Sequence, residues 1–264
     1  MNHFIIGADD KSARIRALLD FTVPLLLIDD GPLIDSLEIP TRRKVARLDW
    51  SKHSFDILKG IDYRRARDFI TILDALFPAG ENTLTKKNAN FVLLKALLNR
   101  PTKLERLISL TKDPAVIDAY QKIETILFSP VLRSVLTKPT NFPMNGIVLA
   151  RINRAELGDF DAFALAAFLI GQFQGQVVVP DLGFYGREMH TALIRQNRLI
   201  AAVNFLGELP AKLQQAALTI KDKTAYRTTL EDAERLVVYF PGISKPSHLT
   251  EQEPGEYRTT ANSS

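Results

Sequence analysis

Cysteine is absent from this sequence of 264 residues, and histidine is rare. The lack of cysteine excludes disulfide bridges, cysteine-ligated zinc sites and thiol nucleophiles. The four histidines (His3, His53, His190 and His248) are scattered, and no two of them are four residues apart. We therefore expect isolated surface or packing roles for them rather than a histidine metal site.

Long hydrophobic runs are also missing. The longest apolar stretch, FDAFALAAFLIGQF at 160–173, is too short to span a bilayer and is typical of a buried helix. The opening residues, MNHFIIGADD, lack the basic segment of a secretory signal. Hydrophobic residues make up 46% of the chain and charged residues 24%, which is ordinary for a globular protein. We expect a soluble, cytoplasmic protein without a membrane span.

Positive charge is in modest excess. The formal net charge is +4, and basic residues cluster in TRRK (41–44), YRRAR (63–67) and GREMHTALIRQNR (186–198). Such clusters permit contact with a polyanion such as DNA. They are also common on ordinary solvated faces, so the charge alone does not decide between DNA contact and a face without a partner.

The order of sequence patterns predicts an α/β fold with a helical insertion. Residues 1–61 and 137–240 alternate short apolar or β-branched runs with helical periodicity, which favours a mostly parallel sheet with helices on both faces. Residues 62–136 carry helical periodicity and few strand signals, and we expect them to form an all-helical insertion. The last segment, 241–264, is polar and partly loose, with a candidate edge strand in GEYRTT.

The stretch FIIGADDKSARIRALLDF (4–21) has the order of a phosphate-binding loop: a strand, a glycine, a Lys-Ser pair and a helix. The full pattern, G-x-x-x-x-G-K-[ST], supplies backbone amides and a lysine for phosphate and a hydroxyl for magnesium. Here only three residues separate Gly7 from Lys11, and the second glycine is missing. Asp9 and Asp10 stand before the lysine, where their charge repels a phosphate.

A second element, QVVVPDL (176–182), ends in one acid rather than two. An ATPase needs an acid for magnesium and a neighbouring acid to activate water. Asp181 supplies the first, but Leu182 stands in the place of the second and cannot take a proton. Magnesium binding by Asp181 and a simple turn aspartate both remain open.

Several stretches, read in order, resemble the FtsK/HerA superfamily of DNA-pumping ATPases, including type IV secretion coupling proteins and DNA-packaging relatives. The most specific are SPVLRSVL (129–136) and AYRTTLEDAERL (225–236). Looser matches are LLLIDDGPLIDSL (25–37), GIVLARINRAELGDFDAFALAAFLI (146–170) and LIAAVNFLGELPAKL (199–213). The resemblance covers nearly the whole chain and implies a RecA-like P-loop NTPase fold that works as an oligomer on DNA.

The resemblance also implies site residues. Gly7, Lys11 and Ser12 correspond to the nucleotide-binding loop, and Asp181 and Asp29 to acids near the magnesium.

Two further positions follow from the same resemblance. Asn204 corresponds to a polar sensor, and Arg227 to an arginine that reaches a neighbouring subunit's nucleotide. Without nucleotide chemistry, we expect Arg227 to pair with Glu231 or with a neighbouring acid instead.

Both phosphate-handling motifs depart from the family pattern, so we predict a degenerate ATPase. We assign no catalytic residue and expect no cofactor; ATP and Mg²⁺ would bind only if the divergent site works. Such a protein would be a structural or DNA-binding part of the DNA-transfer or packaging machinery of a mobile element or virus. Two alternatives remain: an active motor in which Asp29 or Asp30 replaces the missing acid, and an adaptor with only architectural resemblance.

Overall fold

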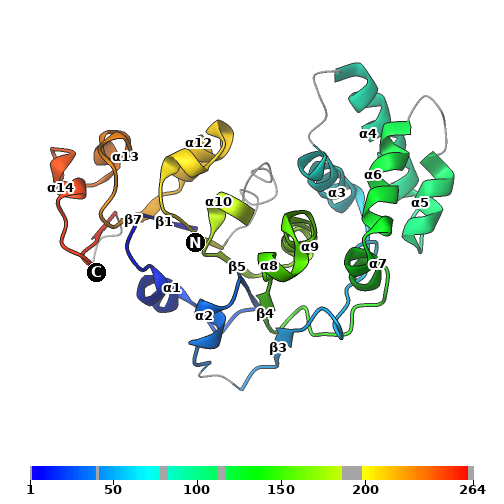
Figure 1. The fold of residues 1–264 in the computed structure, drawn as a ribbon, viewed down its shortest axis with the longest axis horizontal. Helices are drawn as coiled ribbons and strands as arrows, with labels where there is room; N and C mark the ends of the chain where they lie inside the picture. The colour runs from blue at the N-terminus through cyan, green and yellow to red at the C-terminus, as the bar shows by residue number, and fades with distance from the viewer. Residues whose placement is uncertain (1, 40–41, 78–82, 112–116, 186–197, 261–264) are drawn as a thin grey trace.

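The computed structural model describes residues 2–39, 42–77, 83–111, 117–185 and 198–260 (Figure 1). An eight-stranded sheet has the order β3-β4-β2-β5-β6-β1-β7-β8. All neighbouring strands run parallel except β8, which pairs antiparallel with β7. The strands are β1 (His3–Ile6), β2 (Leu25–Asp29), β3 (Val45–Leu48), β4 (Ile147–Arg151), β5 (Gln176–Val179), β6 (Leu199–Val203), β7 (Asp222–Ala225) and β8 (Arg258–Thr259).

The central strands are buried on both faces, which explains their continuous apolar sequences. Alternate side chains enter two separate cores, because successive residues of a strand point to opposite faces. Ile5 of β1 packs in a core with Ile15 of α1 (Ser12–Leu18) and Leu33 of α2 (Pro32–Asp35). Phe4, the neighbour of Ile5, packs in the larger core on the other face.

Helices therefore cover both faces of the sheet, as Figure 1 shows. The larger core is covered by α9 (Asp159–Gln172), which is apolar on nearly all sides, and by α10 (Leu182–Tyr185), α12 (Ala211–Thr219) and α13 (Leu230–Leu236). Other short elements in the described part of the chain are α8 (Arg154–Leu157), α14 (Ser247–Thr250), η2 (Leu206–Glu208) and η3 (Val237–Tyr239).

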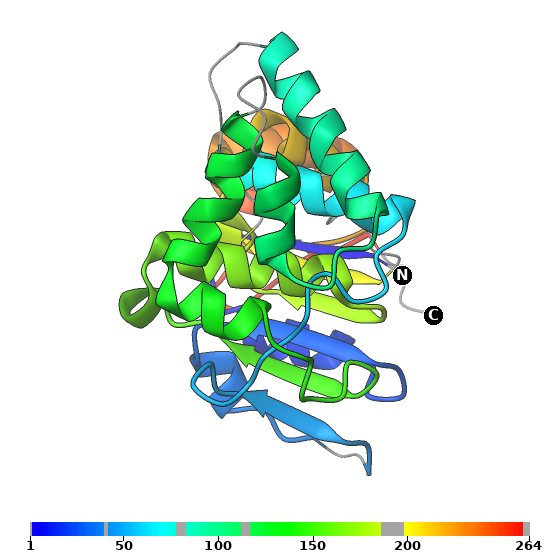
Figure 2. The ribbon, with the colours of Figure 1, turned by 90° about the vertical axis from the view of Figure 1, so that its right-hand side faces the viewer.

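In the described ranges five helices lie between β3 and β4, and Figure 2 looks onto them. They are α3 (Tyr63–Leu76), α4 (Thr83–Leu98), α5 (Leu104–Thr111), α6 (Ile117–Phe128) and α7 (Pro130–Leu136). The first of them packs on α9 through two aromatic pairs, Phe69 with Phe168 and Phe77 with Phe160, with ring centroids 5.3 and 5.5 Å apart. The predicted fold class, an α/β fold with a mostly parallel sheet and an all-helical insertion, is confirmed.

The stretch SPVLRSVL forms α7 and its cap. Ser129 Oγ accepts a hydrogen bond from Leu132 N and donates one to Asp161 on α9, at 2.7 Å to the carboxylate oxygen. Pro130 occupies the first turn, where its missing amide hydrogen costs nothing. The motif thus joins the last helix of the insertion to the helix that covers the sheet.

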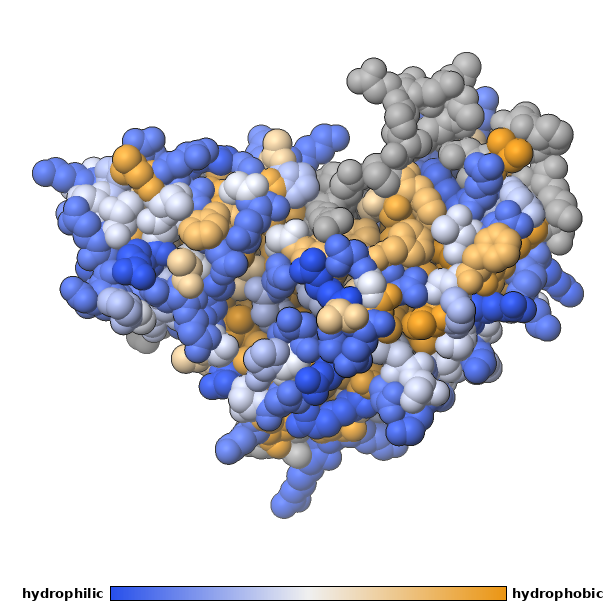
Figure 3. Space-filling model, in the orientation of Figure 1, coloured by the Kyte–Doolittle hydropathy of each residue, from blue (hydrophilic) through white to orange (hydrophobic). Residues whose placement is uncertain are grey.

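The surface in Figure 3 is mostly hydrophilic, and hydrophobic side chains gather mainly over the right-hand part of this face. Exposed apolar residues of the insertion are Tyr63, Phe91, Leu98, Ile117 and Phe128, the last with 75% of its surface accessible. Within the described ranges, no helix combines the length and hydrophobicity that crossing a bilayer requires.

The stretch AYRTTLEDAERL places a buried acid at the start of α13. Asp232 is 4% exposed, and its carboxylate accepts the backbone amide of Leu206 at 2.9 Å. Because Leu206 follows β6, this bond fixes the loop at the end of that strand to α13.

We predict that Asp232→Ala lowers the free energy of unfolding by about 2 kcal/mol, since the buried amide of Leu206 loses its acceptor. Glu231→Ala, at the exposed neighbouring position, is the matched control and changes that free energy by less than about 1 kcal/mol. Urea denaturation of the three proteins measures both values. Equal losses in the two variants would contradict the role given to Asp232.

Candidate functional site

The carboxyl ends of the parallel strands meet at one edge of the sheet, and the residues expected to form a site lie there. Gly7 to Ser12 follow β1, which lies between β6 and β7. Asn204 comes directly after β6 and Arg227 two residues after β7, so both flank the loop. Asp29 is the last residue of β2, and Asp181 comes two residues after β5. Both lie farther along the same edge.

The loop after β1 is held close to β7 at Gly7. This residue has a φ of +133°, and a Cβ atom there would lie 2.6 Å from Cβ of Tyr226, so only glycine fits. The amide of Gly7 donates to Val203 O at 3.2 Å, and that of Ala8 donates to Arg227 O at 3.1 Å. A phosphate-binding loop needs successive amides that point at the ligand. The first two amides of this loop instead bond to the neighbouring strand ends.

Asp10 binds the start of α1. Its Oδ1 accepts the backbone amide of Ser12 at 2.8 Å. Hydrogen bonds from Ser12 are the main cause that holds the pKa of Asp10 below its usual range. The carboxylate therefore stays ionised on the amide that a phosphate would otherwise contact.

Lys11 is turned onto the protein itself. Its ammonium donates to Asn204 Oδ1 at 2.8 Å, to Gly7 O at 2.6 Å and to Asp9 O at 3.2 Å. An ammonium group has three protons, and three acceptors of the chain take them. Burial lowers the pKa of Lys11, while nearby carboxylates, led by Glu208, oppose the shift. The lysine is thus bound to the sensor-like Asn204 rather than to Asp181 or Asp29.

Arg227 forms an ion pair with Asp9, a neighbouring acid of the loop after β1. The guanidinium is 3.7 Å from Asp9 Oδ1, and the Asp9 side chain is only 11% exposed. The other carboxylate oxygen of Asp9 is buried and has no hydrogen-bond partner in the described part of the chain. The arginine that would serve a neighbouring subunit is therefore held within its own chain at the loop.

Asp29 serves as the cap of α2. Its Oδ2 accepts the amides of Gly31, Leu33 and Ile34 at 3.1, 2.9 and 3.2 Å. Burial raises the pKa of Asp29, and the three amides oppose this shift only in part.

The Asp181 carboxylate accepts one hydrogen bond and lies near one cation. Oδ1 accepts the amide of Phe184 at 3.0 Å, and Oδ2 lies 4.0 Å from the guanidinium of Arg154. That guanidinium also stacks 3.7 Å above the ring of Phe184. No group of three His, Cys, Asp or Glu in the described ranges is arranged to hold a metal ion. Asp29 and Asp181 each have partners within the chain, and a magnesium site at these acids stays a prediction.

Glu208 belongs to the site, although no sequence motif predicts it. Its Oε2 accepts the amide of Asn204 at 3.3 Å and would lie 3.0 Å from a Cβ atom at Gly183. Among the charged groups, it contributes most to opposing the shift in the pKa of Lys11. Its position in η2, four residues after Asn204 in the segment that follows β6, is the signal that the sequence offers.

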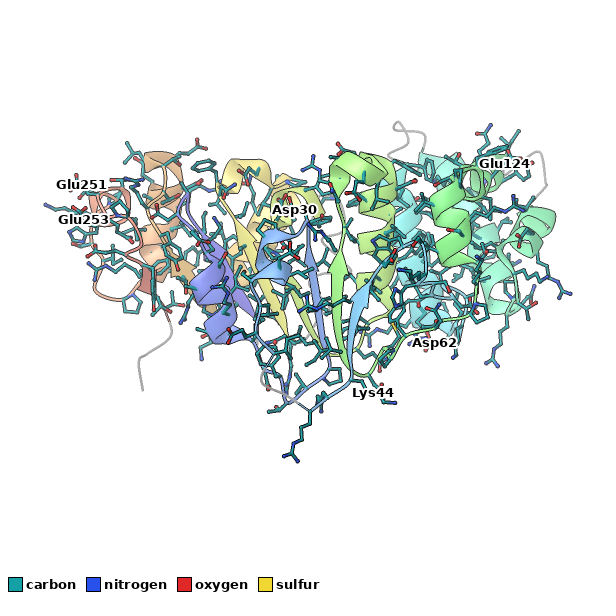
Figure 4. All side chains as sticks on the ribbon, turned by 60° about the horizontal axis from the view of Figure 1, so that its bottom comes forward. Asp30, Lys44, Asp62, Glu124, Glu251 and Glu253 are labelled. Carbon is teal, nitrogen blue, oxygen red and sulfur yellow. The ribbon has the colours of Figure 1, made fainter. Side chains whose placement is uncertain are left out.

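Acids accumulate along this edge. They follow or end five of the parallel strands: Asp9 and Asp10 after β1, Asp29 and Asp30 at β2, Asp49 after β3, Asp181 after β5 and Glu208 after β6. Figure 4 labels Asp30. The nearby cations Lys11, Arg154 and Arg227 already contact oxygens of the chain. A triphosphate would meet an edge of its own charge sign.

Of the comparisons with known proteins, the one with solved structures gives a match. No protein family model matches the sequence, and no curated protein does. Among solved structures, VirB4 of Thermoanaerobacter pseudethanolicus has a similar fold, with a TM-score of 0.63 over 98% of this chain and 88% of that chain. The two sequences are 11% identical, so the similarity shows the fold alone.

We predict that Asp29→Ala lowers the free energy of unfolding by about 2–3 kcal/mol, because three backbone amides lose a charged acceptor. The neighbouring Asp30 is exposed, so Asp30→Ala is a control with the same change of charge, expected to stay within about 0.5 kcal/mol of wild type. Chemical denaturation with and without Mg²⁺ distinguishes the roles. A stabilisation by Mg²⁺ that Asp29→Ala abolishes would show a metal ligand instead of a cap.

Proposed function

We propose that this chain is a nucleotide-free member of the fold that it shares with VirB4, and that it acts as a structural component of a DNA-transfer assembly rather than as a motor. One observation carries the proposal: the groups that would receive a phosphate are bonded within the chain. Asp10 occupies the amide of Ser12, and Lys11 is bound to Asn204 and to two carbonyl oxygens.

Nucleotide binding would require these contacts to be exchanged. Lys11 would have to leave three acceptors, and a triphosphate would approach Asp9 and Asp10 at close range. The first two amides of the loop after β1 also donate to the carbonyl oxygens of Val203 and Arg227. Each contact favours the nucleotide-free state, and the carboxylates add repulsion in a partly buried site.

The site also lacks a general base for ATP hydrolysis at the position after Asp181. Leu182 follows Asp181 and is 2% exposed, so it lies in the core and offers no group to accept a proton from water. The loss of a general base alone typically lowers a rate by two to four orders of magnitude.

The class of assembly is supported by likeness. The fold of VirB4 matches 98% of this chain. The stretches SPVLRSVL and AYRTTLEDAERL, which carry the resemblance to DNA-pumping ATPases, form α7 with its cap and the β7–α13 connection. A place in a homo- or hetero-oligomer of a conjugative or viral machine follows as part of the same proposal.

A divergent but active ATPase is the second candidate. The observation that favours it is the proximity of Lys11, Asn204 and Glu208, since a lysine, a polar sensor and an acid are the groups that hydrolysis needs. In this version Glu208 would take the place of the missing acid, because Asp29 is engaged as a cap.

Calorimetry with ATP and Mg²⁺ separates the two candidates. We expect no binding heat for wild type or for Lys11→Ala. Micromolar binding by wild type that Lys11→Ala abolishes would overturn the proposal and favour the active enzyme.

The variant Asp10→Gly tests whether the Asp10 carboxylate prevents ATP binding. It frees the amide of Ser12 and removes one charge, and we expect it to gain measurable, weak ATP binding. Asp30→Gly removes one charge from the same edge outside the loop and is the matched control, for which no gain is expected.

A further inference from the structure

The edge of the sheet opposite to the acidic one carries the start of the helical insertion. Helix α9 follows β4 and leads to β5, so it runs from the carboxyl edge to the amino edge. The pairs Phe69–Phe168 and Phe77–Phe160 show that α3 runs antiparallel to α9. The first turn of α3 therefore lies at the amino edge, and Figure 4 shows Asp62 and Lys44 on the same lower side of the molecule.

Basic residues gather at this place from two segments. Residues 56–68 and 100–106 together contain seven Lys or Arg and four Asp or Glu. Six of these cations are exposed and form no ion pair with an acid in the described ranges: Lys59, Arg64, Arg67, Arg100, Lys103 and Arg106. The carboxylates of Asp56 and Asp62 are turned to the backbone amides of Leu58 and Arg65.

A groove joins the two segments. Lys59, Gly60 and Asp62 line one side, and Arg100, Pro101 and Thr102 line the other, around a cavity of about 480 Å³. The guanidinium of Arg65 donates to Lys59 O at 3.0 Å and to Gly60 O at 3.4 Å, which fixes the shape of the loop before α3. The groove thus has a cation on each side, Lys59 and Arg100.

An exposed aromatic side chain stands next to the groove. Tyr63 is the first residue of α3, directly after Asp62, and 58% of its surface is exposed. Arg67 lies one turn further along the same helix face. Aromatic rings beside unpaired cations are the arrangement that binds single strands, in which bases stack on the ring and phosphates follow the charges.

The geometry points to a binding surface for single-stranded nucleic acid at the base of the insertion, with phosphates along Lys59, Arg64, Arg67 and Arg100 and a base on Tyr63. This surface lies at the amino edge of the sheet, opposite the edge that carries Lys11. The inference therefore does not depend on whether the carboxyl edge binds ATP. Of the other basic clusters in the sequence, residues 41 and 186–197 lie outside the described residues.

Fluorescence anisotropy with a labelled oligothymidylate of about sixteen nucleotides tests the surface, at salt concentrations from about 50 to 200 mM. We expect wild type to bind, with an affinity that falls as salt rises. Arg64→Ala combined with Arg67→Ala should weaken binding about tenfold at low salt. It should also reduce the slope of log K against log salt by about 1.4, which is about 0.7 for each phosphate that the variant leaves without its cation.

Tyr63→Ala should weaken binding about tenfold without changing that slope, because stacking carries no charge. Tyr63→Phe keeps the ring and should bind as wild type does. The matched control combines Lys212→Ala with Lys245→Ala, two exposed cations outside both segments, and should change the affinity less than twofold.

Three results would overturn the inference: no binding by wild type at low salt, an equal loss in the control pair, or tighter binding to a duplex of the same length. Circular dichroism of each variant checks that it is folded, and Tyr63→Phe keeps the stacking test interpretable if Tyr63→Ala is destabilised.

Discussion

The contacts of Lys11 are the interaction on which the state of this protein depends. Its ammonium joins the loop after β1 to Asn204 after β6, two segments that are 193 residues apart in the sequence. Arg227 closes the other side of the loop by pairing with Asp9. Asp10 accepts the first amide of α1, so both the ammonium of Lys11 and the amide of Ser12 are bonded within the chain. Charged side chains of the loop and its neighbours thus hold the loop in place.

Charge is distributed unequally between the two edges of the sheet. Five of the parallel strands end in acids or lead to them, while exposed cations gather at the amino edge near the start of the insertion. A phosphate-rich partner would therefore approach the side opposite to the one that binds nucleotides in proteins of this fold. This polarity links the two proposals: the same chain that repels a triphosphate at one edge has a surface suited to a polyanion at the other.

Much of the fold could be predicted from the sequence, because buried parallel strands such as Leu25–Asp29 are continuous apolar runs and the insertion has clear helical periodicity. The bond between Asp10 and Ser12 is local, and the sequence already placed an acid before the helix. The contacts that join distant segments could not be predicted, since nothing near Lys11 indicates Asn204 as its acceptor or Glu208 as the acid beside it. Asp29 illustrates a different limit: a strand-terminal acid is equally typical of a metal ligand and of a helix cap, and only the three amides that it accepts favour the cap.

Amide NMR of the loop tests the central claim most directly. In a ¹H–¹⁵N spectrum of wild type titrated with ATP and Mg²⁺, we expect the amide signals of Gly7, Lys11 and Ser12 to stay in place, because Asp10 and the neighbouring strands already hold this loop. Saturable shifts of these signals would contradict the account and would show that phosphate displaces the carboxylates from the loop.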